Sequence, residues 1–241
     1  MSALVDGLRD GIHLVVTGDP QLYDTIGNTL SIAGRSTLIA TLLGVPLGCW
    51  AALGGGRSHR WVRLVLAAGL RLPPVAVGLV LWLLMWPDSR WGGGPLAGLG
   101  WIYTTNAIVL AQTVLALPLV AALVAGGVEA VPGGLIQQAR ALGARPLAIA
   151  ALAMREARPA VIGAILAGFG TSIAVVGAIL VVGSGLSDAT LATAALASWN
   201  AGGADAHAVA NGLVLLALFV LVAAGATSLQ HRRTAWTQLR S

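Results

Sequence analysis

The side chains that most often carry out covalent chemistry are few in this sequence and lie far apart. The histidines, His13, His59, His207 and His231, are dispersed, and no paired carboxylates accompany them. Cys49 is the only cysteine and lies in an apolar stretch, which excludes disulfides and cysteine-rich metal sites. All 14 basic residues are arginine, so the lysine of a P-loop or Schiff base is missing. The sequence argues against an enzyme and against an ATPase site of its own.

The largest group of hydrogen-bonding and charged side chains lies in mid-chain, in the segment LIQQARALGARPLAIAALAMREARP at 135–159. Strongly apolar stretches lie on both sides of it. Such side chains suit noncovalent contact, either with another protein or, in an amphipathic helix, with the membrane surface. A short helix with one arginine binds lipid weakly, so we favour a protein partner for this segment.

The composition identifies the elements that must position this segment. Of 241 residues, 57% are hydrophobic and 10% are charged, and the mean hydropathy is +0.85, which is typical of an integral membrane protein. The pI near 11.0 reflects arginines scattered over short loops and a tail, so a nucleic-acid partner is not expected. Residues 1–19 lack the pattern of a secretory signal, and we expect the first apolar stretch to direct insertion.

Five apolar stretches are long enough to cross ~30 Å of hydrocarbon, which takes ~20 helical residues. They lie at 30–53, 64–86, 105–127, 160–183 and 208–229. We therefore predict an all-α integral membrane protein with one transmembrane domain at 30–229. An extracytoplasmic segment at 1–29 precedes it, and a basic tail at 230–241 follows it.

The arginines between these stretches predict the orientation. They gather in the segment after the first stretch, in the loop at 128–159 and in the tail, so the positive-inside rule places these three segments in the cytoplasm. The other connecting segments carry aspartates. Because the number of spans is odd, we expect the N-terminus outside and the C-terminus in the cytoplasm.

The loop at 128–159 predicts two short helices joined by a tight turn. The first helix runs from Gly133 to Leu142 and stops at Gly143, and Pro146 is placed to begin the second. Near-helical spacing gives the first helix an apolar face made of Leu135, Ile136, Ala139 and Leu142. This face needs a partner, which we expect to be a protein.

The segment QQARALGA at 137–144 resembles the loop motif of the membrane subunits of ABC importers, E-A-A followed by three residues and G. Gln138 and Ala139 stand at the alanine positions and Gly143 at the glycine. The stretches GDPQLYDTIGNTL, LRLPPVAVGL, AQTVLALPLVAAL, REARPAVIGAILAGFG and VGAILVVG resemble, in the same order, stretches of the tungstate permeases in that family. The resemblance covers most of residues 18–183.

This resemblance implies the permease fold of type I ABC importers, with a cytoplasmic coupling helix. It implies a homodimer in the cytoplasmic (inner) membrane of a bacterium or archaeon, two ABC ATPase subunits, and an extracytoplasmic binding protein that delivers an oxyanion, most of all tungstate. ATP and Mg are then bound by the partner ATPase, and this subunit has no cofactor or metal. The residues that the resemblance assigns to ATPase coupling are Gln137, Gln138, Ala139, Leu142, Gly143, Ala144, Arg145, Leu147, Glu156 and Arg158.

The sequence departs from the family pattern at two places. Gln137 stands where the motif has glutamate, so the side chain keeps its hydrogen bonds and loses a charge. The fourth stretch reads GFGTSIAVVGA where related permeases resemble GFGRAISEVGA, so Thr171 and Val175 replace an arginine and a glutamate. A charged pair of the pathway is missing.

Arg35 lies within the first apolar stretch. A charged side chain at the bilayer centre costs ~2.5–3.5 kcal/mol on insertion scales, so it must reach the interface, a partner or a cavity. Two interpretations are open: Arg35 snorkels, or it lines the dimer cavity and attracts the oxyanion in place of the missing arginine. A passage should bind its substrate weakly, and the candidate donors, each also suited to helix packing, are Thr37, Thr41, Gln112, Thr113, Thr171 and Ser172.

Other transporters remain alternatives. Molybdate or sulfate could be the substrate, because in this family selection is expected at the binding protein. A gradient-driven secondary transporter or channel would carry ionisable relay residues within its spans. The spans contain none apart from Arg35 and, near a boundary, Arg71.

Overall fold

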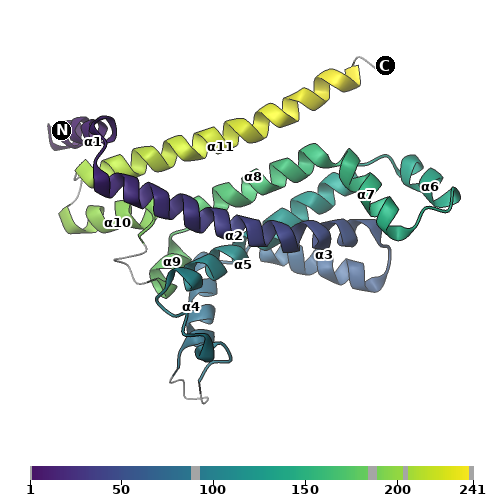
Figure 1. Ribbon diagram of the computed structural model, residues 1–241, viewed down its shortest axis with the longest axis horizontal. Coiled ribbons are helices and arrows are strands. Elements are labelled where there is room, and N and C mark those ends of the chain that lie inside the picture. The colour runs from purple at the N-terminus through teal and green to yellow at the C-terminus, as the bar shows by residue number, and fades with distance from the viewer. Residues whose placement is uncertain (1, 88–92, 184–188, 203–205, 239–241) are drawn as a thin grey trace. The chain divides into compact units, whose positions relative to one another are not determined.

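The computed structural model describes residues 2–87, 93–183, 189–202 and 206–238, and every regular element in these ranges is helical (Figure 1). The chain forms two compact units. Unit 1 comprises Met1–Ser36, Pro73–Thr113 and Gly170–Leu221, and unit 2 comprises Thr37–Leu72, Val114–Phe169 and Val222–Ser241. The prediction of an all-α membrane protein is confirmed.

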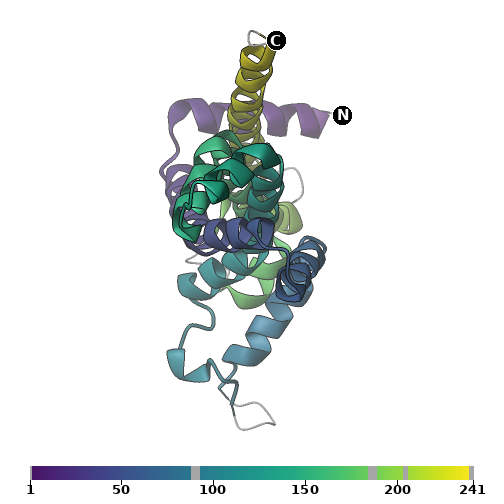
Figure 2. The ribbon, with the colours of Figure 1, turned by 90° about the vertical axis from the view of Figure 1, so that its right-hand side faces the viewer.

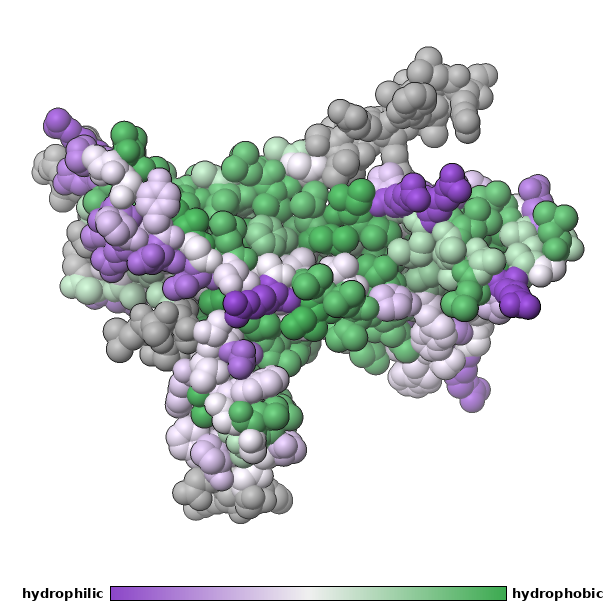
Figure 3. Space-filling view, in the orientation of Figure 1, coloured by the Kyte–Doolittle hydropathy of each residue, from purple (hydrophilic) through white to green (hydrophobic). Residues whose placement is uncertain are grey.

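Four helices contribute residues to both units: α2 (Pro20–Leu53), α5 (Thr105–Glu129), α8 (Arg158–Ala174) and α11 (Ala206–Gln238). Unit 1 also contains α1 (Ser2–Thr17), α4 (Pro74–Met85), the 3-10 helix η1 (Ala97–Leu99), α9 (Gly177–Val182) and α10 (Leu191–Gly202). Unit 2 also contains α3 (Arg57–Gly69), α6 (Gly133–Ala141) and α7 (Pro146–Glu156). Hydrophobic residues cover much of the surface of these helices, as expected for helices that face lipid (Figure 3).

Three predicted spans lie within continuous helices, α2, α5 and α11, which are long and apolar enough to cross a membrane. The stretch at 64–86 is divided into α3 and α4, because proline restricts the residue before it and has no N–H to continue a helix; Pro74 instead occupies the first turn of α4. The stretch at 160–183 is divided between α8 and α9. In the described ranges there are three continuous candidate spans, or up to five if the bent pairs α3–α4 and α7–α8 each count as one. The number of spans and the sides of the termini stay predictions.

Two helix starts depend on local capping. The Asp19 carboxylate accepts a hydrogen bond from the backbone N–H of Leu22 at 3.0 Å, and Pro20 begins α2, so this helix starts ten residues earlier than predicted. Helix α10 was missed and was treated as loop. Its first N–H, from Leu191, donates to Thr29 Oγ1 at 2.8 Å, and the N–H of Thr190 donates to Thr193 Oγ1 at 2.9 Å. The bond to Thr29 attaches α10 to α2, and the bond to Thr193 caps the start of α10 locally.

Small residues allow the helices of each unit to approach closely. In unit 1, α1 crosses the beginning of α11 (Figures 1 and 2), and a Cβ at Gly11 would lie 2.9 Å from Cγ1 of Val209. In unit 2, a Cβ at Gly48 of α2 would lie 2.3 Å from the carbonyl oxygen of Ala121 in α5. Membrane helices gain little from apolar burial against one another, so such backbone proximity is their main source of packing energy.

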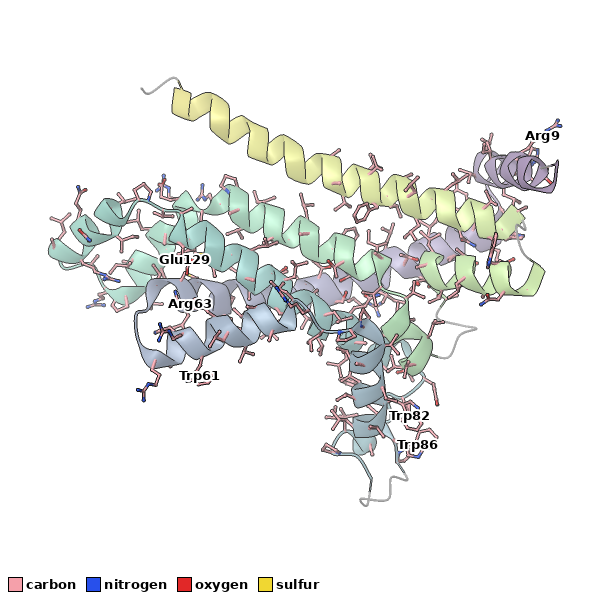
Figure 4. The ribbon with its side chains drawn as sticks, turned by 180° about the vertical axis from the view of Figure 1, so that it is seen from behind. Arg9, Trp61, Arg63, Trp82, Trp86 and Glu129 are labelled. Atoms are coloured by element: carbon pink, nitrogen blue, oxygen red, sulfur yellow. The ribbon has the colours of Figure 1, made fainter. Side chains whose placement is uncertain are left out.

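Unit 2 has a core where α2, α5, α7 and α8 meet. The side chain of Cys49 is buried there in one cluster with Val120, Val124 and Ala153, so this cysteine packs the core. On the exposed side of α3, Arg63 donates to Glu129 of α5 at 3.0 Å (Figure 4). Both side chains are nearly half exposed, at 44% and 47%, so this ion pair contributes at most about 1 kcal/mol.

We predict that Gly48→Ala destabilises the protein by about 1–3 kcal/mol, because the added methyl group meets the Ala121 carbonyl and the two backbones must separate. The midpoint of thermal unfolding in detergent, followed by tryptophan fluorescence, should fall by several degrees. Gly34→Ala is the control, since no atom lies within 4 Å of its Cβ position in the same helix. Equal midpoints for the two variants would contradict the close α2–α5 contact.

Candidate functional site

The segment at 133–156 folds as the predicted helix, turn and helix. Helix α6 ends at Ala141, and Gly143 has φ 77°, the left-handed conformation that glycine adopts without a steric cost. The N–H of Gly143 donates to the Arg140 carbonyl, and the N–H of Ala144 donates to the Ala139 carbonyl, both at 3.0 Å. This pair of bonds is a complete Schellman motif, so the Ala139 and Arg140 carbonyls near the end of α6 are satisfied without water.

The second helix of this segment begins at Pro146, as predicted. Helices α6 and α7 lie side by side, joined by the turn (Figures 1 and 2). At its other end α7 meets α8 at a bend of 74° beside Ala157. The buried residues of α7, Ile149 and Ala153, fix it to unit 2. The turn is therefore connected, through one short helix, to a long membrane helix.

The apolar face of α6 is divided between two environments. Ile136 packs against the core of unit 2, and Leu135 and Ala139 are half-buried, so most of the face predicted to need a foreign partner is covered by the chain itself. Leu142 was expected on the same face and is instead 88% exposed, because α6 ends before it and the left-handed residue redirects the backbone. Leu147, on the other side of the turn, is 85% exposed.

The other predicted coupling residues lie near these two leucines, at the end of α7 or at the start of α8. Ala144 is half-buried. The exposed members are Gln137, Gln138, Gly143, Arg145, Glu156 and Arg158. Two large apolar side chains on a tight turn, with polar groups beside them, form a compact surface suited to docking on a protein. Their role in ATPase coupling stays a prediction.

Two of the predicted pathway residues in unit 1, Gln112 and Thr113, lie at a buried polar contact between α2 and α5. Gln112 Oε1 lies 2.9 Å from the hydroxyl of Ser36, and Thr113 Oγ1 lies 3.4 Å from the Ser36 carbonyl. The Ser36 hydroxyl is also 3.0 Å from the Ala33 carbonyl, and its single hydrogen serves one of the two oxygens at a time. Gln112 thus joins two helices here, whereas the Thr113 hydroxyl donates at 2.7 Å to the Val109 carbonyl of its own helix. Ser36 was missed, although it lies next to Thr37.

Three other pathway candidates have enclosed hydroxyls. The Thr25 and Thr29 hydroxyls bond back to carbonyls four residues earlier, whereas those of Thr37, Thr41 and Ser172 have no hydrogen-bond partner among the described residues. A buried hydroxyl without a hydrogen-bond partner costs ~1–3 kcal/mol of stability. A polar ligand that accepts a hydrogen bond from such a group would remove this cost. Thr171 is half-buried in α8.

Arg35 lies on the exposed side of α2. Three and seven residues farther along the same helical side are Leu38 and Leu42, which are 60% and 65% exposed. This side of α2 therefore needs lipid or another chain to cover it. Lipid there is compatible with a snorkelling Arg35, and a second chain is compatible with an Arg35 that lines the dimer cavity.

A polar pocket of about 720 Å³ in unit 1 was not predicted from the sequence. It lies between α2, α10 and α11, with Asp24, His207 and the 95% buried Asn211 in its lining. Among the described residues of the lining there is one carboxylate and no arginine, so their charge does not favour a dianion. Among the described residues, no cluster of histidine, cysteine and carboxylates suits a metal ion.

Comparison with known proteins supports the predicted family. Residues 44–235 match the family of binding-protein-dependent transport system inner membrane components. The chain is 31% identical to the tungstate uptake system permease protein TupB of Peptoclostridium acidaminophilum, over 96% of this chain and 100% of that protein. It is 28% identical to the molybdenum transport system permease protein ModB of Azotobacter vinelandii, over 81% of this chain and 89% of that protein.

The fold also matches a solved structure. A chain of the MetNI methionine ABC transporter, in an inward-facing conformation, aligns with a TM-score of 0.63 over 93% of this chain and 99% of that chain, at 19% identity. This likeness confirms the predicted type I permease fold and carries no information on substrate. With the family match over most of its length, the chain belongs to the binding-protein-dependent transport system inner membrane components, the permease subunits of ABC importers.

Proposed function

We propose that this chain is the membrane-spanning subunit of an ATP-driven importer for tungstate. The observation that carries the proposal is the similarity to a tungstate uptake permease over nearly the whole of both chains. The subunit acts as a homodimer, with two ATPase subunits on the side of the α6–α7 turn and an oxyanion-binding protein on the other. ATP and Mg bind to the ATPase subunits. Molybdate is the second candidate substrate, because a molybdenum permease is 28% identical to this chain.

The α6–α7 turn is the part that receives motion from the ATPase. Leu142 and Leu147 project from it, and the Schellman bonds at Gly143 make it a stiff unit. Closure of the ATPases displaces the turn, and α7 transmits the displacement to α8 at the Ala157 bend. The permease then exchanges inward-facing and outward-facing states, a two-state equilibrium that ATP biases.

The passage for the oxyanion uses neutral donors and one charge. The Thr37, Thr41 and Ser172 hydroxyls donate to the passing ion, which offers oxygen acceptors only. Arg35 attracts the ion from the exposed side of α2, where the second copy of the chain covers it. Weak donors permit release, which a tight site would slow.

Reconstitution tests the substrate and the energy source together. We expect vesicles that contain this chain, its partner ATPase and the binding protein to accumulate labelled tungstate only when ATP is supplied, with molybdate as a weaker competitor. Omission of the ATPase is the control. Uptake driven by an ion gradient without the ATPase would identify a secondary transporter, and stronger inhibition by molybdate would reverse the substrate assignment.

Gly143→Ala tests the stiff turn. A side chain in the left-handed conformation costs about 1–2 kcal/mol, so amide hydrogen exchange in a peptide spanning 142–144 should accelerate by roughly 5–30-fold. The same variant should stimulate the partner ATPase less than the wild type does. Gly134→Ala, within α6 and with open space at its Cβ position, is the matched control and should change neither. Unchanged exchange in Gly143→Ala would refute the turn as described.

Arg35→Gln tests the attraction of the oxyanion. Loss of a charge-assisted hydrogen bond costs about 1.5–3 kcal/mol, so the KM for tungstate uptake should rise by roughly 10-fold or more. Arg35→Lys retains the charge and should lose less. If Arg35→Gln inserts normally and transports with an unchanged concentration dependence, Arg35 snorkels to the interface and has no part in the pathway.

A further inference from the structure

In addition to the polar pocket of unit 1, the structure contains a large groove in unit 2. The chemistry of this groove differs from that of the proposed pathway. A groove of about 710 Å³ lies between the last two turns of α2, the beginning of α3, Arg140 of α6 and the face of α7. Its walls are almost entirely apolar, with Cys49, Trp50, Ile149 and Met154 among them. A groove of this kind binds a long apolar group rather than a hydrated ion.

A guanidinium group and an imidazole ring line this groove. Arg140 lines it, is exposed, and makes one long hydrogen bond, from Nη2 to the Leu53 carbonyl at 3.4 Å, which leaves most of its five N–H donors for other acceptors. The His59 ring also lines the groove and lies against Trp50, with ring centroids 4.0 Å apart. Among the described lining residues there is no carboxylate.

A second hollow continues the same surface past α7. It has a volume of about 360 Å³ and shares Ala151 and Met154 with the groove. Arg155 and Arg158 line it, beside apolar residues of α8. The two hollows therefore form one apolar surface around α7, with guanidinium groups on both sides.

The charge of the whole unit is complementary to an anion. Unit 2 contains eleven of the 14 arginines in the sequence and two of the nine acidic residues. Basic segments of this kind face the cytoplasm, and basic pockets between membrane helices at that level bind anionic lipid head groups. Trp50 and Trp61, which are 45% and 64% exposed, suit the same interfacial level.

We propose that this surface binds one anionic diacyl phospholipid. The acyl chains lie in the groove along α2 and α7, and the phosphate accepts hydrogen bonds from the Arg140 guanidinium, a geometry for which arginine is suited. The lipid would fill the space between α2 and α7 and so support the helix that carries the α6–α7 turn. The site does not depend on the proposed substrate.

Native mass spectrometry of the purified subunit, without the ATPase, tests the proposal. The probes are phosphatidylglycerol and phosphatidylcholine with identical acyl chains. We expect the wild-type protein to retain one phosphatidylglycerol at concentrations about tenfold below those needed for phosphatidylcholine. Arg140→Gln, at an exposed position, should abolish this preference, and Ala151→Trp, also exposed, should block both lipids by filling the groove. Thermal unfolding verifies that each variant is folded.

Arg60→Gln is the matched control, because Arg60 is an exposed arginine of unit 2 outside the groove lining, and the variant should retain the preference. Equal retention of the two lipids by the wild type would overturn the proposal. So would an equal loss in Arg60→Gln and Arg140→Gln, which would show diffuse surface attraction. If no lipid is retained, and the groove is protected from solvent only after the ATPase subunit is added, this surface is the ATPase interface and the proposal fails.

Discussion

Every backbone N–H and C=O within hydrocarbon must find a partner inside the protein, and the structure depends on this constraint. Long helices satisfy it along α2, α5, α8 and α11. Where a helix begins or ends, a specific group takes over. The Asp19 carboxylate caps α2, Thr29 accepts the first N–H of α10, and the N–H groups of Gly143 and Ala144 close α6. The points at which the chain changes direction are therefore chemically defined.

The hydrocarbon environment also explains how the helices pack against one another. Because lipid is as apolar as leucine, contact between helices comes from close backbone approach and from buried hydrogen bonds. The α2–α5 pair uses both: Gly48 lies against the Ala121 carbonyl in unit 2, and Ser36 bonds to Gln112 in unit 1. Polar residues in apolar stretches are thus divided into those that join helices and those, such as Thr37 and Ser172, whose hydroxyls have no partner in the described ranges.

The surface of unit 2 contains two neighbouring sites of different chemistry. The exposed leucines on either side of Gly143 suit a protein, since they form a small rigid apolar projection. The groove beside them is deep, apolar and bordered by arginine, which suits an amphiphile. Both surfaces share α7, so the position of this one short helix depends on what occupies each of them. A lipid in the groove would contact the α6–α7 turn directly, because Pro146 and Leu147 line the groove.

The sequence by itself determined the fold class, the family, and the local conformation of the loop at 128–159. Periodicity and composition specify helices, while Gly143 and Pro146 fix a turn through backbone rules that need no tertiary contact. Only the tertiary structure decided which polar side chains pair across helices and where apolar side chains are exposed. Ile136 and Leu142 are equally apolar in sequence, yet one packs in a core and the other is 88% exposed, because the backbone reverses between Ala141 and Ala144. The capping of α10 by Thr29, 162 residues away, and the lipid-sized groove likewise arise from segments distant in sequence.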